Sequence, residues 1–293
     1  MPFWPDRFHL ESVRSGTAAA PFVGALDAFT PTYAWSHRRA LVSSFEGNIL
    51  QARRTSDSEP YNVARLANGE GNIAGLQSFS GSGTAAVAAL TEQMGTGKDF
   101  IQPTADVQRI IVDAGSLVTV GGKASSRGLR GPLSPDTPGG GMYTNSFSAY
   151  TGTTLSFFLR GAHDAYATGS WFEGIVDAYL GLGRSSDYAY DIYLYRSPAI
   201  SAGMSRIGNF GTFNSDYLIS IIFDGTNVTF RDGTNTYVAS WSTSFIHDRF
   251  IFGYAAGITA EGNTSLYNHW QESAVWLSDQ TANEAAIRSA LTT

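Results

Sequence analysis

Residues 219–237 read Ile219-Ser220-Ile221-Ile222-Phe223-Asp224-Gly225-Thr226-Asn227-Val228-Thr229-Phe230-Arg231-Asp232-Gly233-Thr234-Asn235-Thr236-Tyr237. Two Asp-Gly pairs here separate three short runs that are rich in β-branched and aromatic residues. Glycine accepts the positive φ that a tight hairpin turn requires, so the pattern predicts three antiparallel strands joined by two hairpins. Loop carboxylates can also bind calcium, but two hairpins explain Asp224 and Asp232 without an ion.

The same strand pattern extends in both directions from this meander. Alternating apolar and polar residues predict strands near 33–41 and 49–54, and turn residues separate most of the later runs. These later runs are 154–160, 174–182, 188–196, 217–223, 227–230, 236–241 and 249–254. Many short strands with few helices predict an all-β protein, an antiparallel sandwich of the jelly-roll kind.

Three segments fall outside this strand pattern. Residues 1–25 hold three prolines and no sustained period, which predicts an extended N-terminal arm, and residues 26–293 then form one sandwich domain. Residues 82–93 are rich in alanine, so a short helix or an apolar connector is expected there. Residues 279–291 predict a short C-terminal helix that packs Ile287 and Leu291 against the sandwich. The Pro- and Gly-rich stretch 121–141 is interpreted as a long connection inside the sandwich.

Composition excludes several classes of protein. The chain has 293 residues, of which 43% are hydrophobic and 15% charged, so it can bury a core. Its net charge of −6 argues against binding to a phosphate backbone. The absence of cysteine excludes disulfide scaffolds, thiolate metal sites and cysteine nucleophiles. We expect no cofactor, no metal, no nucleic-acid partner and no membrane span.

Motifs for the common hydrolases are also missing. No G-x-S-x-G occurs, and none of the five histidines lies beside a nucleophile elbow. The pairs His163-Asp164 and His247-Asp248 do not suit one metal site, because neighbouring residues on a strand face opposite sides. The segment Gly95-Thr96-Gly97-Lys98 lacks the hydroxyl residue of a phosphate-binding loop and is interpreted as a turn.

Sugar chemistry is the remaining enzymatic alternative. A glycosidase needs two carboxylates about 5–10 Å apart, and the candidates are Glu173, Asp177, Asp191 and Glu272. The spacing of these residues along the chain does not identify two of them as a catalytic pair. Aromatic rings such as Trp171, Tyr179, Tyr193 and Trp270 could stack on sugars, or they could be cross-strand packing residues.

Residues 38–54 carry a family resemblance. They read Arg-Arg-Ala-Leu-Val-Ser-Ser-Phe-Glu-Gly-Asn-Ile-Leu-Gln-Ala-Arg-Arg and are followed by Thr55-Ser56-Asp57. This segment resembles the opening of the concanavalin A-like catalytic domain of α-L-arabinofuranosidase B enzymes, and of phage virion proteins that share it. The stretches 90–105, 109–115 and 277–283 resemble the same group, so the likeness spans about residues 33–291.

The resemblance implies a fold but not a complete catalytic set. At the position of the family's nucleophilic glutamate this chain has Tyr179 or Tyr193, depending on the alignment. The segment 252–257 has glycine where the acid/base aspartate is expected, and the family's adjacent cysteine pair is missing. A shifted alignment would place Glu261 or Glu272 in these roles.

The resemblance therefore favours a non-catalytic structural protein of a tailed-phage virion, as a head decoration or as a tail or fibre component, with the arm of residues 1–25 attaching it to the particle. No catalytic residue is expected, and host-surface carbohydrate would bind through Trp171, Tyr179, Tyr193 and Trp270. The expected partners are other capsid or tail proteins, and the chain is expected to form a homo-oligomer in the virion. The alternatives are a glycoside hydrolase or polysaccharide depolymerase of the same fold, and a purely architectural cement protein.

Overall fold

The computed structural model describes residues 21–128, 142–145, 150–163, 180–184, 190–194, 205–210, 216–233, 235–240, 245–247, 250–252 and 268–293. Within these residues β-strands dominate, and the two α-helices are α1 (Ile73–Ser80) and α2 (Glu284–Thr292). Single 3-10 turns lie at Ala105–Val107 and Thr281–Asn283. The strands are β1 (Tyr33–Ser36), β2 (Asn48–Arg54), β3 (Pro60–Ala64), β4 (Ala85–Leu90), β5 (Phe100–Ile101), β6 (Arg109–Asp113), β7 (Ser116–Leu117), β8 (Thr119–Val120), β9 (Lys123–Ala124), β10 (Ser126–Arg127), β11 (Met142–Thr144), β12 (Tyr150–Gly152), β13 (Thr154–His163), β14 (Leu180–Arg184), β15 (Tyr190–Leu194), β16 (Ser205–Phe210), β17 (Asp216–Asp224), β18 (Asn227–Asp232), β19 (Asn235–Ser240), β20 (Phe245–His247), β21 (Ile251–Phe252) and β22 (Asn268–Trp276).

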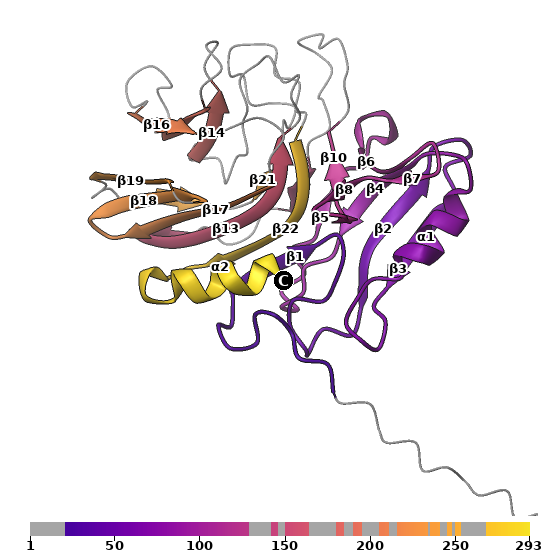
Figure 1. Cartoon of the computed structure of the whole chain (residues 1–293), viewed down its shortest axis with the longest axis horizontal. Helices are drawn as coiled ribbons and strands as arrows, with labels where there is room; N and C mark the ends of the chain where they lie inside the picture. Colours follow the sequence, from indigo (N-terminus) through magenta and orange to yellow (C-terminus); the bar gives the residue numbers. More distant parts are fainter. Residues whose placement is uncertain are drawn as a thin grey trace, which may run out of the picture.

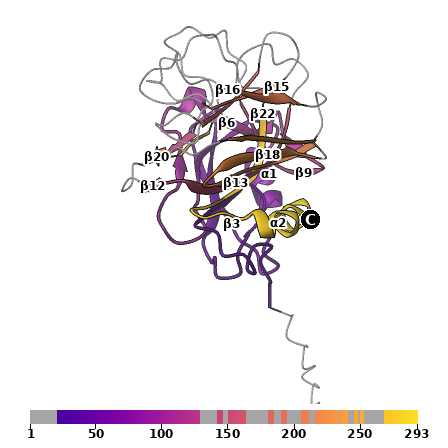
Figure 2. The same ribbon diagram turned by 90° about the vertical axis from the view of Figure 1, so that its left-hand side faces the viewer.

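One large antiparallel sheet organises the molecule. Its main path runs β19-β18-β17-β13-β22-β10-β6-β4-β5-β11-β21, with β1 paired to β22 and the β2-β3 pair attached through β4. Figure 1 shows the curved β13-β17-β22 part with α2 on one side and the β14-β15-β16 sheet on the other. Figure 2 shows the same layering from the side. The predicted all-β jelly-roll sandwich is therefore confirmed.

The predicted meander is present as β17, β18 and β19. Ile221 lies opposite Phe230, and Phe230 lies opposite Tyr237 on the third strand. The turn glycines have φ of 95° at Gly225 and 54° at Gly233, as the Asp-Gly pattern requires. Asp224 Oδ1 accepts hydrogen bonds from the Thr226 and Asn227 amides at 2.7 Å, so its carboxylate is used by the turn itself.

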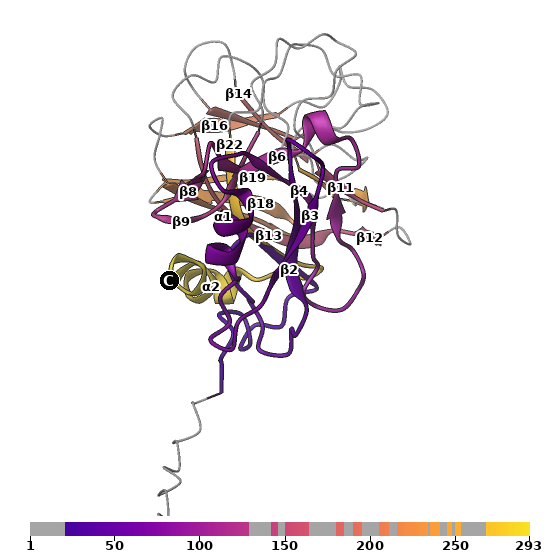
Figure 3. The same cartoon turned by 90° about the vertical axis from the view of Figure 1, so that its right-hand side faces the viewer.

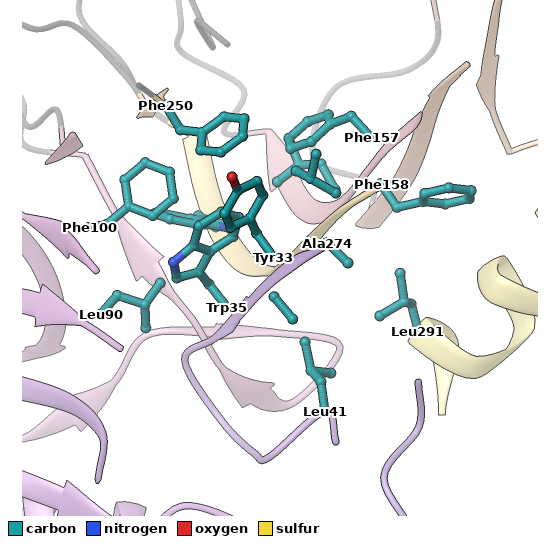
Figure 4. Packing of buried hydrophobic residues seen from close by; sticks show 14 of the residues in the cluster. Tyr33, Trp35, Leu41, Leu90, Phe100, Phe157, Phe158, Phe250, Ala274 and Leu291 are labelled. Atoms are coloured by element: carbon teal, nitrogen blue, oxygen red, sulfur yellow. The ribbon is translucent and has the colours of Figure 1, made fainter. Parts of the chain in front are cut away.

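Aromatic side chains from distant strands of the large sheet pack together. The Trp35 ring meets Phe100 edge to face at 4.8 Å, and Phe100 meets Trp270 in the same way at 4.9 Å. Phe250 packs on Trp35 and Tyr33, as Figure 4 shows. These rings come from β1, β5 and β22 and from the residue before β21, so this packing fixes β1 between segments far apart in the sequence.

The C-terminal helix lies where the sequence places it. Ile287 and Leu291 are fully buried against the sheet, as predicted. Polar contacts add to this packing, because Glu284 Oε1 accepts a hydrogen bond from Arg231 Nε at 2.9 Å and Arg288 Nη1 donates to Ser220 Oγ at 3.0 Å. The helix begins at Glu284, later than predicted, and a 3-10 turn precedes it in which Asp279 Oδ1 accepts the Thr281 amide.

The expectation of a helix or connector at 82–93 is wrong. Residues 85–90 form β4, which is buried along almost its whole length between β2 and β6. The local helix is α1, where the Asn72 side chain accepts the Gly75 amide and caps the first turn. Figure 3 shows α1 beside β2 and β3. Tertiary burial overrides the helical preference of alanine here.

The predicted arm and the loop 129–141 fall mainly outside the described residues. Residues 1–20 carry no structural description, while Phe22 already packs on the domain with the Arg65 guanidinium 4.8 Å from its ring. Within the described ranges, no helix combines the length and the apolar composition needed to cross a bilayer. The first part of the predicted 121–141 connection contains β9 and β10.

Gly161 is expected to tolerate no side chain. It lies at the register shift between β13 and β22, where an added Cβ would meet the main-chain oxygen of His269 at 2.1 Å. The main chain cannot move without opening the ladder, so Gly161→Ala should lower the free energy of unfolding by about 3 kcal/mol. Urea denaturation measures this. Gly47→Ala is the control, because its Cβ would meet only the movable Phe45 ring; equal midpoints for the two variants would contradict the prediction.

Candidate functional site

The four predicted sugar-binding aromatics are not brought together by the described part of the structure. Trp171 and Tyr179 lie outside the described residues, and Tyr193 is described only as a backbone position on β15, opposite Gly181 and Arg206. Trp270 is 0% exposed and packs edge to face on His37 and Phe100. A ring enclosed in the core cannot stack on a sugar, so the assignment of Trp270 to carbohydrate binding is corrected.

The structure describes only some of the candidate carboxylates. Glu173, Asp177 and Glu261 lie outside the described residues. Asp191 is a backbone position on β15, opposite Gly183 and Asn209 and two residues before Tyr193. Glu272 on β22 is fully described, and its surroundings determine what its carboxylate can do.

Glu272 is the centre of a buried ionic cluster, here called the Glu272 cluster, that consists of Ser36, Arg38, Arg39 and Glu272. Glu272 Oε1 lies 2.7 Å from Arg38 Nε and 2.8 Å from Arg39 Nε, and it accepts the Ser36 hydroxyl at 3.2 Å. Arg39 Nη2 also donates to Oε2 at 3.3 Å. The antiparallel pairing of Ser36 with Glu272 across β1 and β22 brings these groups together.

The charges of this cluster hold Glu272 ionised. Burial raises the pKa of the Glu272 carboxyl, but the Arg39 and Arg38 guanidiniums outweigh burial and leave that pKa below its usual range. The side chain is 0% exposed. A carboxylate that is ionised near neutral pH cannot act as a general acid. A carboxylate that is fully buried cannot reach a sugar to attack it. Glu272 is therefore a structural ion, and the hypothesis that it is catalytic is corrected.

A second buried polar group, here called the His37 chain, consists of Arg109, Ser126, His37 and the Gln271 carbonyl. Arg109 Nε donates to Ser126 Oγ at 3.0 Å, and Ser126 Oγ lies 2.9 Å from His37 Nε2. His37 Nδ1 lies 3.2 Å from the Gln271 carbonyl oxygen. These distances fit a neutral imidazole that donates from Nδ1 to the carbonyl and accepts at Nε2 from the Ser126 hydroxyl.

The surroundings of His37 also favour the neutral imidazole. Burial lowers the pKa of His37 to about 3, and the nearby Arg109 cation acts in the same direction. A Ser-His contact of this length is also found in hydrolases, but Ser126 and His37 are both 0% exposed. The His37 chain therefore links the residue after β1 to β6, β10 and β22 rather than presenting a nucleophile. Sequence analysis could not find this pair, because 89 positions separate its members.

The loop after β4 is held by a buried carboxylate. Glu92 Oε1 accepts the Met94 amide at 2.7 Å, and Oε2 accepts the Thr96 amide at 2.8 Å and the Thr96 hydroxyl at 2.7 Å. This is the 95–98 segment that sequence analysis interpreted as a turn, and Gly95 and Gly97 take positive φ within it. In the part of the chain that the structure describes, no three His, Cys, Asp or Glu side chains gather to hold a metal ion.

Comparison with known proteins identifies the fold more closely. The family model of the α-L-arabinofuranosidase B catalytic domain matches residues 26–119. A GH54 α-L-arabinofuranosidase soaked with a cyclic sulfate inhibitor superposes with a TM-score of 0.65 at 15% identity, covering 92% of this chain and 65% of that one. The chain has the fold of that enzyme.

A second solved structure agrees with the first. An arabinofuranosidase complexed with arabinofuranosyl-α-1,2-xylobiose gives a TM-score of 0.60 at 15% identity, covering 91% of this chain and 64% of that one. The chain thus spans a little under two thirds of the length of these relatives. No curated protein matches the sequence. The family match covers the part of the chain that carries β1 to β7, including His37, Arg38 and Arg39.

Proposed function

We propose that this protein is a glycoside hydrolase that acts on polysaccharides carrying α-L-arabinofuranosyl groups. The observation that supports this most is the match of residues 26–119 to the arabinofuranosidase B catalytic domain. The shared fold with two arabinofuranosidase structures over more than nine tenths of the chain supports it further. The net negative charge fits a neutral sugar substrate better than a polyanion.

The proposed mechanism uses two carboxylates on either side of the glycosidic bond. One protonates the leaving oxygen, and the other attacks the sugar carbon or activates a water molecule. Glu272 is removed from the candidates by its burial and its two arginine partners. The remaining candidates are Glu173, Asp177, Asp191 and Glu261.

Hydrolysis is tested with 4-nitrophenyl α-L-arabinofuranoside and with arabinose-substituted polysaccharides, by measuring nitrophenol and reducing ends. Each candidate carboxylate is changed to its amide, Glu173→Gln, Asp177→Asn, Asp191→Asn and Glu261→Gln. Two of the four changes should reduce kcat at least about 100-fold, because general acid–base catalysis contributes that much. Asp57→Asn is the control, since Asp57 pairs with Arg54 on the surface and should keep full activity. Activity that no single change reduces would contradict the choice of these four candidates, and no activity on any of the substrates would contradict hydrolysis.

A second candidate function keeps carbohydrate binding and omits hydrolysis. It is favoured by Tyr179 or Tyr193 standing where the resemblance expects the nucleophilic glutamate. In this proposal the chain is a structural component of a tailed-phage virion, on the head or on the tail, that adheres to host polysaccharide. Gold labelling of purified particles with an antibody against the chain would locate it on heads or tail tips, and unlabelled particles would count against this role.

A further inference from the structure

Two exposed apolar side chains flank one surface contact of the domain. Among the described residues the exposed large apolar side chains are Val23, Leu66 and Val238, which are 74%, 43% and 62% exposed. Val238 lies on β19, whereas Val23 and Leu66 follow the two partners of a contact in which the Arg65 guanidinium lies 4.8 Å from the centroid of the Phe22 ring. We call Phe22, Val23 and Leu66 the base patch. Single exposed apolar residues are common, but apolar residues gathered at one place mark interaction surfaces.

The base patch is held in a fixed position on the domain. An added Cβ at Gly69 would lie 2.1 Å from Phe22 Cε2, so the ring rests directly on the Gly69 main chain. The Gly69 amide donates to the Leu66 carbonyl at 2.9 Å, and Arg65 Nη1 pairs with Glu46 Oε2 at 2.8 Å. A surface that is already ordered loses little conformational entropy when it binds a partner, so these contacts favour binding.

The base patch lies where the chain enters the domain. Figures 1, 2 and 3 show the first described residues at the lower end of the molecule and the β14-β15-β16 sheet at the opposite end. Residues 1–20, here called the arm, are joined to the domain beside the patch through Pro21. The arm contains three aromatic residues, Phe3, Trp4 and Phe8. Aromatic residues are enriched in protein–protein interfaces.

The arm is long enough to reach a second copy of the protein. A fully extended chain of 20 residues spans about 70 Å. A compact domain the size of residues 21–293 has a radius of gyration of about 19 Å and hence a diameter of about 50 Å. The reach of the arm thus exceeds the width of the domain, so two copies that lie base to base can exchange their arms. A symmetric contact of this kind uses the same two surfaces, the arm and the base patch, on both copies.

We propose that the base patch of one copy binds the arm of a second copy, so that the protein is a homo-oligomer held together by exchanged arms. Phe3, Trp4 and Phe8 supply the side chains that cover Val23 and Leu66. The contact removes apolar surface of both copies from water, which is the main driving force of such association. It does not use the β14-β15-β16 sheet, and it does not depend on whether the protein hydrolyses sugars.

Light scattering after size-exclusion chromatography measures the oligomeric state of the full chain. The wild type should have at least twice the mass of one chain, 31.4 kDa. Val23→Glu and Leu66→Glu each place a charge in the base patch and should raise the Kd of association at least about 30-fold. Val238→Glu is the matched control, because it places the same charge at an exposed apolar residue of another strand and should leave the Kd unchanged. Circular dichroism spectra equal to that of the wild type show that the variants keep the fold.

Mixing two full-length variants tests the exchange of arms. The double change Trp4→Glu and Phe8→Glu damages the arm and leaves the base patch intact, whereas Leu66→Glu does the reverse. Neither variant should associate alone, but an equal mixture should form a hetero-oligomer, because one chain supplies the arm and the other supplies the patch. A mixture that stays monomeric would overturn the proposal, and so would an oligomer that survives the two arm changes. A monomeric wild type would also overturn it and would leave the base patch to a different protein.

Discussion

Glu272→Gln should lower the free energy of unfolding by about 3–5 kcal/mol, the range for breaking a buried ion pair by removing one partner. Arg38 and Arg39 are 2% and 12% exposed, and both face the same carboxylate. A neutral amide leaves two guanidiniums close together without a negative charge between them. The Ser36 hydroxyl also loses its charged acceptor.

Urea denaturation of the wild type and the variant at pH 7 measures this loss. Glu46→Gln is the matched control, because Glu46 also pairs with an arginine, Arg65, but is 80% exposed. An exposed pair of this kind contributes about 0.5 kcal/mol. Equal losses in the two variants would show that the Glu272 cluster does not stabilise the fold.

This prediction also separates structure from catalysis at Glu272. If the protein hydrolyses arabinofuranosides, Glu272→Gln should lose activity only to the extent that it unfolds. A variant that stays folded and stable yet loses about 100-fold in kcat would place Glu272 in the reaction and contradict its assignment as a structural ion.

The parts of the fold that could be predicted from sequence depend on local chemistry. The β17-β18-β19 meander follows from two Asp-Gly pairs, each of which acts within four residues. Helix α2 follows from the spacing of Ile287 and Leu291 on one face. Both patterns lie within a few consecutive residues, so they can be recognised without knowledge of the distant contacts.

The predictions that were wrong concern segments whose structure depends on contacts with residues far away in the sequence. Residues 85–90 have the composition of a helix but form β4, because β2 and β6 pair with this segment along its two edges and the sheet leaves it almost fully buried. Trp270 was predicted to stack on sugars, yet its ring is buried and packs on His37 and Phe100. Only the folded chain shows these neighbours.

The resemblance predicted the fold, but it did not predict the buried polar groups. The resemblance was to the arabinofuranosidase B catalytic domain and to phage virion proteins that share it, and the family match to residues 26–119 agrees with the first of these. The ionic cluster was not predictable, since Glu272 lies 233 positions from Arg39. Charged residues are common on strands, and no spacing rule distinguishes a buried glutamate with two arginine partners from an exposed one.

The protein is expected to lose stability as the pH falls from 6.5 towards 3. Burial and the Arg109 cation lower the pKa of His37 from 6.5 to about 3 in the folded protein. Between these values the unfolded chain binds a proton that folded His37 does not, so protons favour unfolding. His37 alone should cost about 3 kcal/mol between pH 6.5 and pH 4.

A His37→Gln variant isolates this contribution, because glutamine can keep hydrogen bonds to Ser126 and to the Gln271 carbonyl but does not titrate. Urea denaturation of both proteins at several pH values should show a smaller loss in the variant between pH 6.5 and pH 4. The lowered pKa of Glu272 also makes the protein less stable as the pH falls, but mainly below pH 4.5, the ordinary pKa of the group. Both proteins therefore show this contribution equally. Identical pH profiles would mean that His37 is protonated in the folded state, and the hydrogen bond from Ser126 to Nε2 would then be wrong.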